Sequence, residues 1–514
     1  MKLVSDPAIA DKIRKMKQRV QWQDPAIVQR GIDQTRFVLE NGESDNPEFS
    51  FLVVGDSGSG AHRGHHPQRE IAELMLPHHP ECSFMLHTGD VVYLLGSSDH
   101  YDENFIKPYR EFLVGEPKRI SYDNMVFSLP ILPVPGNHDY YDLPLVLGLV
   151  SLTTLPLRQL LQSKLYLDLG WHGSGKGDAY ARAFLDYLKA FKHTGELSSH
   201  LDKHYTAKTD TGRCLRYEPG RFTRLPNRYY TFRYGGIDFF ALDSNTFNDP
   251  PPLADTTEGK ANRLQLEKRR DELEEQKQQM METVATLNLD NPVEAEQLDD
   301  IHGRVSQIEE IIVDIDKQLA TDGKIETDID QLEWLKLRLI ESWHTKDVRG
   351  RVIYLHHPPY VTEATKWEQG QTLAVRSRLR GVFNAVAQVV GYPTQERPLV
   401  DLVLTGHAHC LEHIETMNTG SADSHIHSMI CGGSGFSLRR QRPEGPDLME
   451  NKSLVARSHL FIGRNGEGSE KRRPYSSLRI DVKGGSRPKF IIRPLVAEWY
   501  HRQWHYPQIQ QIVI

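Results

Sequence analysis

The sequence is poor in cysteine and has no excess of positive charge, and both shortages exclude classes of protein. Its 514 residues include only four cysteines, which are scattered and form no Cys-x-x-Cys pair. This usage does not fit a small disulfide-rich domain, so we expect reduced or packed thiols. The net charge of -7 at pH 7 provides no basic field for nucleic acid. We therefore expect no nucleic-acid partner.

Long apolar runs are also missing. No charge-free apolar stretch is long enough to cross a bilayer, and residues 1–7 lack the apolar core of a signal peptide. These two absences predict a cytoplasmic protein without a transmembrane segment. The uncharged stretch 143–157 is short and is interrupted by Pro144 and Pro156. We interpret it as a buried helical insert in preference to a lipid-facing lid.

What the sequence does contain is a repeated pattern, in which an apolar run ends in glycine and a metal-binding type of side chain. The run 49–54 leads into Asp56, and the run 82–86 leads into Asp90 and Tyr93. Each run is predicted to be a buried strand, and ligands of open α/β sheets bind beyond the carboxyl ends of the strands. Carboxylates delivered there are suitable ligands for hard cations.

The same pattern recurs three more times along the chain. The runs 131–135, 351–355 and 400–405 are followed by Asn137, His138 and Asp139, by His356 and His357, and by His407 and His409. A single motif of this kind is weak evidence, because Asp and Gly are ordinary turn residues. Five motifs in order, each after its own predicted strand, favour a metal site.

The series resembles the calcineurin-like metallophosphoesterases, and specifically their purple acid phosphatase branch. That branch has Asp-x-Gly, Gly-Asp-x-x-Tyr, Gly-Asn-His-Asp/Glu, a later His and Gly-His-x-His. Gly58 stands where many other members have histidine, and Tyr93 stands where the purple branch has its compensating ligand. The resemblance covers about 49–141, 225–246 and 330–436, and it implies an α/β fold, the four-layer αββα sandwich.

The resemblance also implies two metal ions. One ion would take Asp56, Asp90, Tyr93 and His409, and the other would take Asp90, Asn137, His356 and His407. His356 is preferred to His357 because the family's ligand lies two residues before a proline. A phenolate ligand favours a trivalent hard ion, so iron is expected beside Tyr93. Iron, manganese or zinc is expected at the other position.

The expected reaction is hydrolysis of a small-molecule or macromolecular phosphate ester by direct attack of a metal-bound hydroxide. His138 would protonate the leaving oxygen, and Asp139 would orient His138 and raise its pKa. Two alternatives stay open. One is a phosphodiesterase for nucleotides or lipid headgroups, and the other is a non-catalytic scaffold. The complete set of ligand positions favours catalysis.

We predict three regions: an N-terminal helical segment, 1–48, a catalytic domain, 49–436, and a β-rich C-terminal extension, 437–514. The catalytic domain carries a helical insert at 143–222. In the first region, a short helix is expected to begin at Asp24-Pro25. The histidine-rich loop 61–67 is interpreted as solvated, in preference to a contact with phosphate.

A second insert, 256–322, is predicted to be an antiparallel coiled-coil hairpin. Its second half places apolar residues at alternating steps of three and four, and its first half repeats them every seven. These residues are Leu266, Leu273, Met280, Leu287, Leu298, Ile301, Val305, Ile308, Ile312, Ile315 and Leu319. A homodimer interface or protein-docking arm and a self-packed insert are equally compatible with this pattern.

Overall fold

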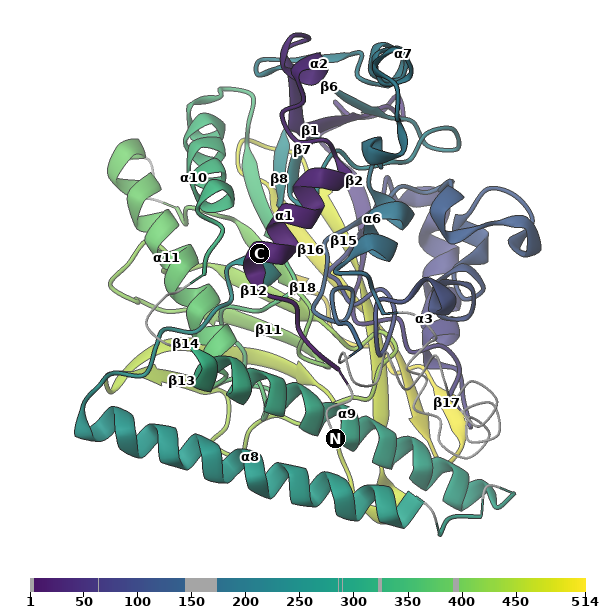
Figure 1. The fold of residues 1–514 in the computed structure, drawn as a ribbon, viewed down its shortest axis with the longest axis vertical. Helices are drawn as coiled ribbons and strands as arrows, with labels where there is room; N and C mark the ends of the chain where they lie inside the picture. Colours follow the sequence, from purple (N-terminus) through teal and green to yellow (C-terminus); the bar gives the residue numbers. More distant parts are fainter. Residues whose placement is uncertain are drawn as a thin grey trace.

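Two β-sheets lie face to face in the middle of the molecule (Figure 1). The structure is a computed structural model that describes residues 4–62, 64–143, 173–284, 286–288, 290–321, 326–391 and 397–514. The larger sheet has the order β13 (Asp447–Glu450), β14 (Ser453–Ile462), β11 (Leu411–Thr416), β12 (His427–Cys431), β10 (Leu402–Thr405), β9 (Gly350–Tyr354), β8 (Ile237–Ala241), β7 (Tyr230–Tyr234), β1 (Ile32–Leu39), β6 (Gly212–Tyr217) and β5 (Ala207–Thr209). The smaller sheet has the order β17 (Gln503–His505), β16 (Lys489–Tyr500), β15 (Arg473–Lys483), β2 (Phe49–Val54), β3 (Met85–His87) and β4 (Ile131–Pro133), and β18 (Ile512–Val513) also pairs with β16.

Side-chain alternation along the strands of the larger sheet explains how the layers pack. Phe239 and Val352 point into the core shared with the smaller sheet. Their neighbours Phe240 and Ile353 pack into a second core with α10 (Ile329–His344) and α11 (Gly370–Val390). Successive strand residues point to opposite faces, so both faces of this sheet are buried.

The smaller sheet has its own helical cover. Helix α3 (Pro67–Met75) packs against β15 and β16, on the side away from the larger sheet (Figure 1). Helices, sheet, sheet and helix therefore follow one another across the molecule. The predicted four-layer α/β sandwich is confirmed.

We expected the N-terminal region to be helical, but it also contains a strand. Helix α1 (Ile9–Arg19) is followed by α2 (Pro25–Val28), where the Asp24 carboxylate accepts a hydrogen bond from the Ala26 amide at 2.8 Å. After α2 the chain turns at Gly31, with φ +60°, and forms β1 between β6 and β7. Its Phe37 and Leu39 side chains are buried in the main core. Residues 32–39 form a strand because the sheet buries these side chains, and the local sequence pattern did not predict this strand.

The strands of region 437–514 enter both sheets: β13 and β14 lie at one edge of the larger sheet, and β15, β16 and β17 belong to the smaller sheet. Strand β15 pairs antiparallel with β2 from Val482 opposite Phe49 to Leu478 opposite Val53. Strand β16 continues the sheet beyond β15. This region therefore supports the strand that carries Asp56 at its end.

The helical insert predicted after residue 142 is described only from residue 173 onward, so most of the stretch 143–157 lies outside the described residues. The described part contains α6 (Asp178–Phe184), α7 (Thr194–His204), the edge strand β5 and its neighbour β6. In the described ranges, no helix combines the length and apolar character that a membrane crossing requires.

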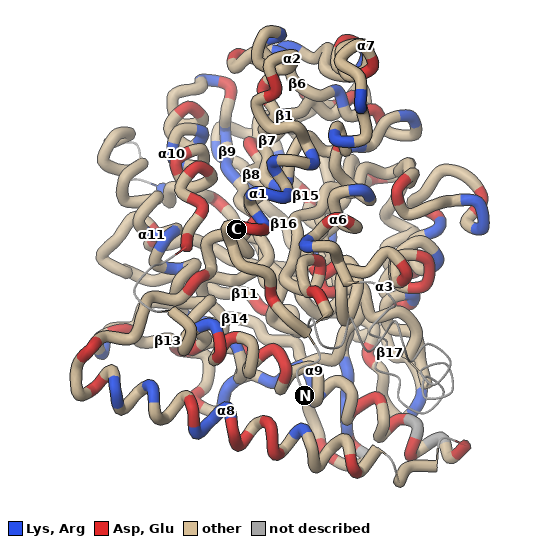
Figure 2. Tube along the Cα trace, in the orientation of Figure 1, with Lys and Arg blue, Asp and Glu red and all other residues tan. Residues whose placement is uncertain are grey.

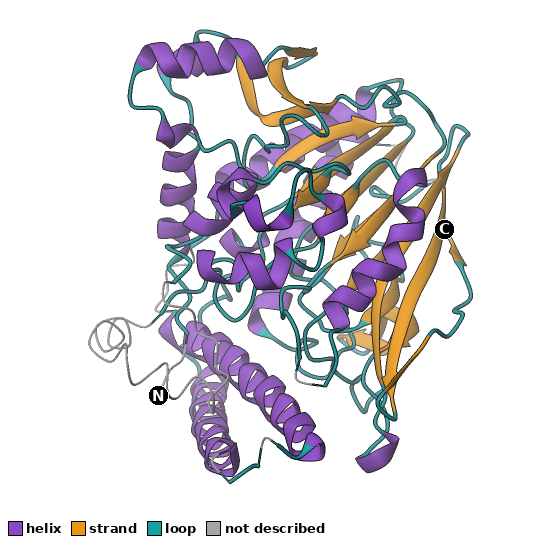
Figure 3. Cartoon of the chain, turned by 90° about the vertical axis from the view of Figure 1, so that its right-hand side faces the viewer, coloured by secondary structure: helices purple, strands orange, loops and turns teal. Residues whose placement is uncertain are grey.

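The second insert forms two long helices, α8 (Thr257–Val284) and α9 (Pro292–Ala320), at the foot of the sandwich (Figure 3). The predicted apolar residues meet between them in two clusters, one around Leu273 and Ile312 and one around Val284 and Leu298. Acidic and basic residues alternate along α8 (Figure 2). Helix α9 also packs on the body of the protein, where Val313 joins Val4 and Leu95 in a buried cluster. A partner for α8 stays a prediction.

A buried ion-pair triad joins the sandwich to α10. The Arg228 guanidinium donates to Asp243 at 2.9 Å and also to Asp328, and all three side chains are at most 2% exposed. Asp328 caps α10 by accepting from the Gln331 amide at 3.3 Å. Removing one partner of such a cluster leaves uncompensated buried charge.

We expect Arg228→Met to lower the free energy of unfolding by about 3–5 kcal/mol, because two buried carboxylates lose their cation. Urea denaturation followed by circular dichroism measures the change. The matched control is Arg457→Met, which removes an exposed pair with Asp447 and should cost less than about 1 kcal/mol. Equal losses in the two variants would contradict the importance of the triad.

Candidate metal centre

The five motifs meet at one edge of the sandwich. Strands β2, β3 and β4 are parallel neighbours in the smaller sheet, and β9 and β10 are parallel neighbours in the larger sheet. Because parallel strands end at the same edge, the loops after them lie together. The structure brings all seven predicted ligands to this place, each at most 3% exposed: Asp56, Asp90, Tyr93, Asn137, His356, His407 and His409.

The first group of donor atoms is centred on the Tyr93 hydroxyl. It lies 2.8 Å from Asp90 Oδ2, 3.0 Å from Asp56 Oδ1 and 3.3 Å from His409 Nε2. His409 Nε2 lies 3.5 Å from Asp56 Oδ1. Ligand atoms that bind one cation at 2.0–2.2 Å are themselves about 3.0–3.5 Å apart. These four side chains therefore have the spacing of a coordination shell.

The second group shares one atom with the first. His356 Nε2 lies 3.4 Å from Asp90 Oδ2 and 2.9 Å from Asn137 Oδ1. His407 Nδ1 lies 3.0 Å from the same Asn137 oxygen. Asp90 Oδ2 thus belongs to both groups, which is the position of a bridging carboxylate between two cations.

Each of the three imidazoles uses its second ring nitrogen elsewhere. His356 Nδ1 lies 2.8 Å from the Thr88 carbonyl, and His409 Nδ1 lies 3.1 Å from the Ser437 carbonyl. His407 Nε2 lies 3.4 Å from Gln369 Oε1. Each outer contact to oxygen orients the other ring nitrogen toward the centre, where a bound cation would replace any proton on that nitrogen. This is the usual arrangement of metal-binding histidines.

The backbone around the centre has unusual dihedral angles. Asp56, Asp90 and His407 have φ of +52°, +54° and +64°, which is costly for residues other than glycine and is typical of functional sites. Glycine is needed at 136 and 406, because an added Cβ would lie 2.1 Å from Asp90 Oδ1 or 2.4 Å from Asp56 Oδ2. The motif glycines therefore permit the close approach of loops from both sheets.

The electrostatics of the centre favour added positive charge. Burial would lower the pKa of His356, but the Asp90 charge and hydrogen bond outweigh it and raise this pKa to about 9. Burial opposes ionisation of Asp90, yet the neighbouring His356 and His138 hold its pKa below the ordinary value. A set of two carboxylates, a phenol, an amide and three imidazoles fits hard or borderline cations. The residues present therefore fit the two metal ions that the motifs imply.

The His138 ring is not hydrogen-bonded to the Asp139 carboxylate, contrary to our expectation. The Asp139 carboxylate instead accepts backbone hydrogen bonds from Gly136 at 2.8 Å and from Asp90 and Val91 at 3.1 Å. Burial and the Asp90 charge raise the pKa of Asp139 to about 7. The turn at 136–139 directs this side chain beneath the Asp90 loop, so it holds that loop in place.

The partner of His138 comes from the hairpin and was not foreseen. His138 Nε2 lies 3.2 Å from Glu310 Oε1, and Glu310 Oε2 accepts from Lys366 Nζ at 2.6 Å. Glu310 belongs to α9, and its side chain is 5% exposed. Its position in the sequence, beside the apolar seam of a charged helix, is also typical of a solvated residue. No local pattern could have identified it.

Two other predictions concern histidines near the centre. His357 is outside both donor groups, since it contacts Ser244 Oγ at 2.8 Å and Asn248 at 3.2 Å. We expected the loop after β2 to be solvated, but His65 in this loop is only 9% exposed. Its ring stacks on Trp499 with the centroids 4.9 Å apart. The C-terminal strands cover this histidine.

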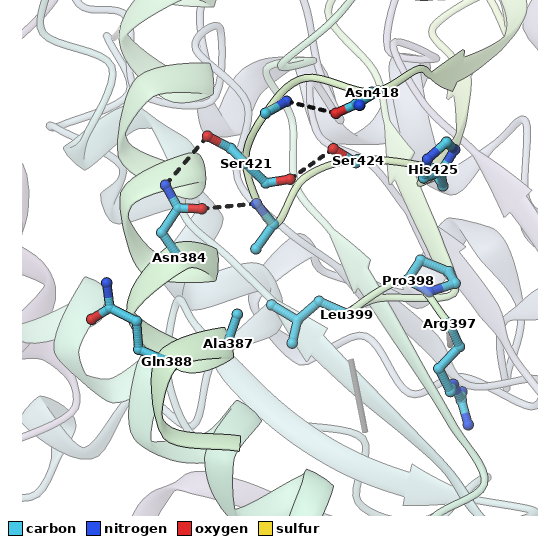
Figure 4. A pocket seen from close by; sticks show the side chains of 12 residues that line it. Asn384, Ala387, Gln388, Arg397, Pro398, Leu399, Asn418, Ser421, Ser424 and His425 are labelled. Atoms are coloured by element: carbon cyan, nitrogen blue, oxygen red, sulfur yellow. Dashed lines mark hydrogen bonds between the residues drawn. The ribbon is translucent and has the colours of Figure 1, made fainter. Parts of the chain in front are cut away.

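A cavity of ≈ 730 Å³ lies away from the centre, between the end of α11 and the loop 418–425 (Figure 4). None of the seven predicted ligands lines it. Asn384 in its wall is bonded to the Ala422 amide at 2.8 Å and to Ser421 at 3.4 Å. Its polar groups therefore hold the loop, and the cavity lies apart from both groups of donor atoms.

Comparison with known proteins gives similarity at the level of structure. No family model matches the sequence, and no curated protein matches it. Purple acid phosphatase PPD1 from yellow lupin (Lupinus luteus) seeds is similar, with TM-score 0.43, 11% identity, and coverage of 92% of this chain and 54% of that chain. The present chain thus spans about half the length of the lupin protein.

Two further solved structures are similar to this chain. PhoD has TM-score 0.41 and 11% identity, and the match covers 92% of this chain and 70% of that chain. GAP50, described as the anchor in the inner membrane complex of Plasmodium, has TM-score 0.36 and 13% identity, with coverage of 90% and 89%. All three TM-scores are below 0.5, so the functional argument depends on the centre itself.

Proposed function

We propose that this protein hydrolyses phosphate esters with two metal ions held at the centre. The first ion would be held by Asp56, Asp90, Tyr93 and His409, and the second by Asp90, Asn137, His356 and His407. The observation that carries the proposal is the position of Asp90 Oδ2 in both donor groups, 2.8 Å from Tyr93 and 3.4 Å from His356. Two cations there would neutralise the phosphate charge and lower the pKa of an attacking water.

His138 is the proton donor in this proposal. Its Nδ1 lies 2.6 Å from the Leu94 carbonyl, and its Nε2 faces the Glu310 carboxylate. The Leu94 carbonyl and the ionised Glu310 carboxylate can only accept hydrogen bonds. Both ring nitrogens of His138 therefore carry protons, and the ring is a cation. Burial lowers the pKa of His138, but Asp90 and Glu310 outweigh this effect and raise it. A charged imidazole beside the centre can protonate the leaving oxygen.

Glu310 competes with the substrate in this conformation. The Nε2 proton that would reach the leaving oxygen is directed at Glu310, and Lys366, a potential phosphate contact, is paired with the same carboxylate. The leaving oxygen must therefore take the place of Glu310. Hydrolysis would require the Glu310 side chain, or the part of α9 that carries it, to move from His138.

Metal analysis of the purified protein, together with hydrolysis of aryl phosphate monoesters and diesters, tests the function. We expect two ions per chain at the centre and turnover of at least one ester class. The ratio of kcat/KM for the two classes separates a phosphomonoesterase from a phosphodiesterase for nucleotides or lipid headgroups. Two bound ions without turnover of either class would favour the scaffold alternative, and a centre without ions would reject the proposal.

The Tyr93 phenol predicts a spectroscopic signal. Iron is proposed at the Tyr93 position, with iron, manganese or zinc at the other, because a phenolate favours a trivalent hard ion. The oxidised iron-loaded protein should show a visible charge-transfer band that Tyr93→Phe loses. Tyr101→Phe is the control, since Tyr101 is fully buried outside both donor groups. A band that persists in Tyr93→Phe would reject this assignment.

A further inference from the structure

Three side chains outside the proposed catalytic centre form a second concentration of metal-binding atoms. His62 and His65 lie in the loop after β2, and Asp299 lies on α9. Their ligating atoms all lie within 4.8 Å of one another. Neither His62 nor His65 has a role in the proposed hydrolysis, and Asp299 belongs to the hairpin insert. This cluster therefore joins two parts of the chain that are far apart in the sequence.

We propose that His62, His65 and Asp299 bind a further cation of the zinc type and fasten α9 to the sandwich. Two imidazoles and one carboxylate are a common zinc ligand set, with water as the fourth ligand. Ligand atoms on a tetrahedral zinc ion are about 3.3 Å apart, so side-chain movements of about 1–2 Å would complete the site.

His65 is held as a ligand would be. Its Nε2 lies 3.1 Å from the Tyr475 hydroxyl, and its buried Nδ1 has no hydrogen-bond partner. The ring stacks on Trp499, with an interplanar angle of 7°, and also lies against Trp504, at a centroid distance of 5.8 Å. An outer hydrogen bond to one nitrogen and a free second nitrogen is the arrangement found in metal-binding histidines.

His62 completes the imidazole pair. Its ring centroid lies 4.9 Å from that of His65. Burial lowers the pKa of His62 to about 4 and the pKa of His65 well below its ordinary value. Both rings are therefore neutral at pH 7, and metal binding needs no proton to be displaced from them.

One nearby cation, Arg473, would oppose an added ion, but its charge is already balanced. Its guanidinium pairs with Glu296 at 2.7 Å and with Asp300 at 2.9 Å. Asp300 also pairs with Lys471 at 2.7 Å. These pairs already place α9 against β15, so the cation would strengthen a contact that the fold makes. Glu310 lies on the same helix, so this cation would hold α9 at the metal centre.

The test uses Asp90→Ala protein, in which the proposed catalytic centre is expected to lose its ions. After treatment with a chelator, this protein is titrated with Zn²⁺ and with Co²⁺. We expect one bound ion per chain, and with Co²⁺ the visible absorption of a tetrahedral site. When Asp299→Asn, His62→Ala or His65→Phe is introduced into the Asp90→Ala protein, each substitution should remove that ion. His65→Phe keeps an aromatic ring against Trp499 and so protects the fold.

The matched control is His66→Asn, because His66 lies in the same loop and its side chain accepts from the Arg69 amide at the start of α3. Asparagine can also cap a helix, so this variant should keep the ion. Equal binding by the control and all three ligand variants would overturn the proposal, as would the absence of any bound ion in the Asp90→Ala protein. Either result leaves the proposed hydrolysis untouched, because that function is tested on the protein with Asp90 intact.

Discussion

Asp90→Ala is expected to remove both ions from the catalytic centre and to reduce kcat/KM for aryl phosphates by at least about 10³-fold, a loss of several kcal/mol of transition-state stabilisation. The physical reason is that one carboxylate oxygen serves both donor groups. Asp90 Oδ2 is 2.8 Å from the Tyr93 hydroxyl and 3.4 Å from His356 Nε2. Its removal leaves each group short of a negative ligand.

Metal analysis and steady-state kinetics on the same preparation measure both effects. Asp102→Ala is the control, because Asp102 is an exposed residue at the start of the short helix η3 (Asp102–Ile106) and pairs with Lys107 at 3.0 Å. This variant should keep its ions and its turnover. An Asp90→Ala protein that still binds both ions at the centre would show that Asp90 does not bridge them.

Glu310→Gln is expected to raise kcat/KM by about tenfold, mainly through a lower KM. A hydrogen bond between charged groups contributes about 1.5–3 kcal/mol, and glutamine keeps the shape but loses the charge. The bonds to His138 at 3.2 Å and to Lys366 at 2.6 Å would both weaken. A phosphate oxygen could then displace the side chain more easily.

Glu309→Gln is the matched control, since Glu309 pairs with Lys277 of α8 at 2.8 Å and lies outside the centre. Its kinetics should equal those of the unmodified protein. In a double-mutant cycle, the gain from Glu310→Gln should become smaller when His138 is also replaced by alanine, because only the bond to Lys366 is then left to weaken. A fall in turnover restricted to esters with poor leaving groups would instead make Glu310 a residue that positions His138.

Much of the centre could be predicted from the sequence, and the reason is topological. Asp56, Asp90, Asn137, His356 and His407 each follow an apolar run that forms a strand. Strands that run parallel in a sheet end at a common edge, so short motifs far apart in the chain can be placed together without coordinates. The choice of Asp139 as partner of His138 was wrong because two neighbouring residues in a turn point in different directions.

Other features depended on contacts that no local pattern encodes. The sequence 32–39 is a strand because β6 and β7 lie on either side of it. His65 is buried because Trp499, from the far end of the chain, covers its ring. Each outcome depends on a segment that is distant in the sequence but adjacent in the fold. A periodicity of two or 3.6 residues shows only which face of an element is apolar.

By itself, the sequence predicted the α/β class, the candidate metal-binding side chains and the two-helix insert. The spacing of apolar residues and the residues at strand ends predicted buried strands, a site beyond them and the hairpin, while the four-layer sandwich and the full ligand set came from the family resemblance. The tertiary structure alone decided that Asp90 offers one oxygen to two donor groups and that α9 brings Glu310 to His138. The physical reason is that hydrogen bonds and coordination depend on distances of about 3 Å, and packing between distant segments sets those distances.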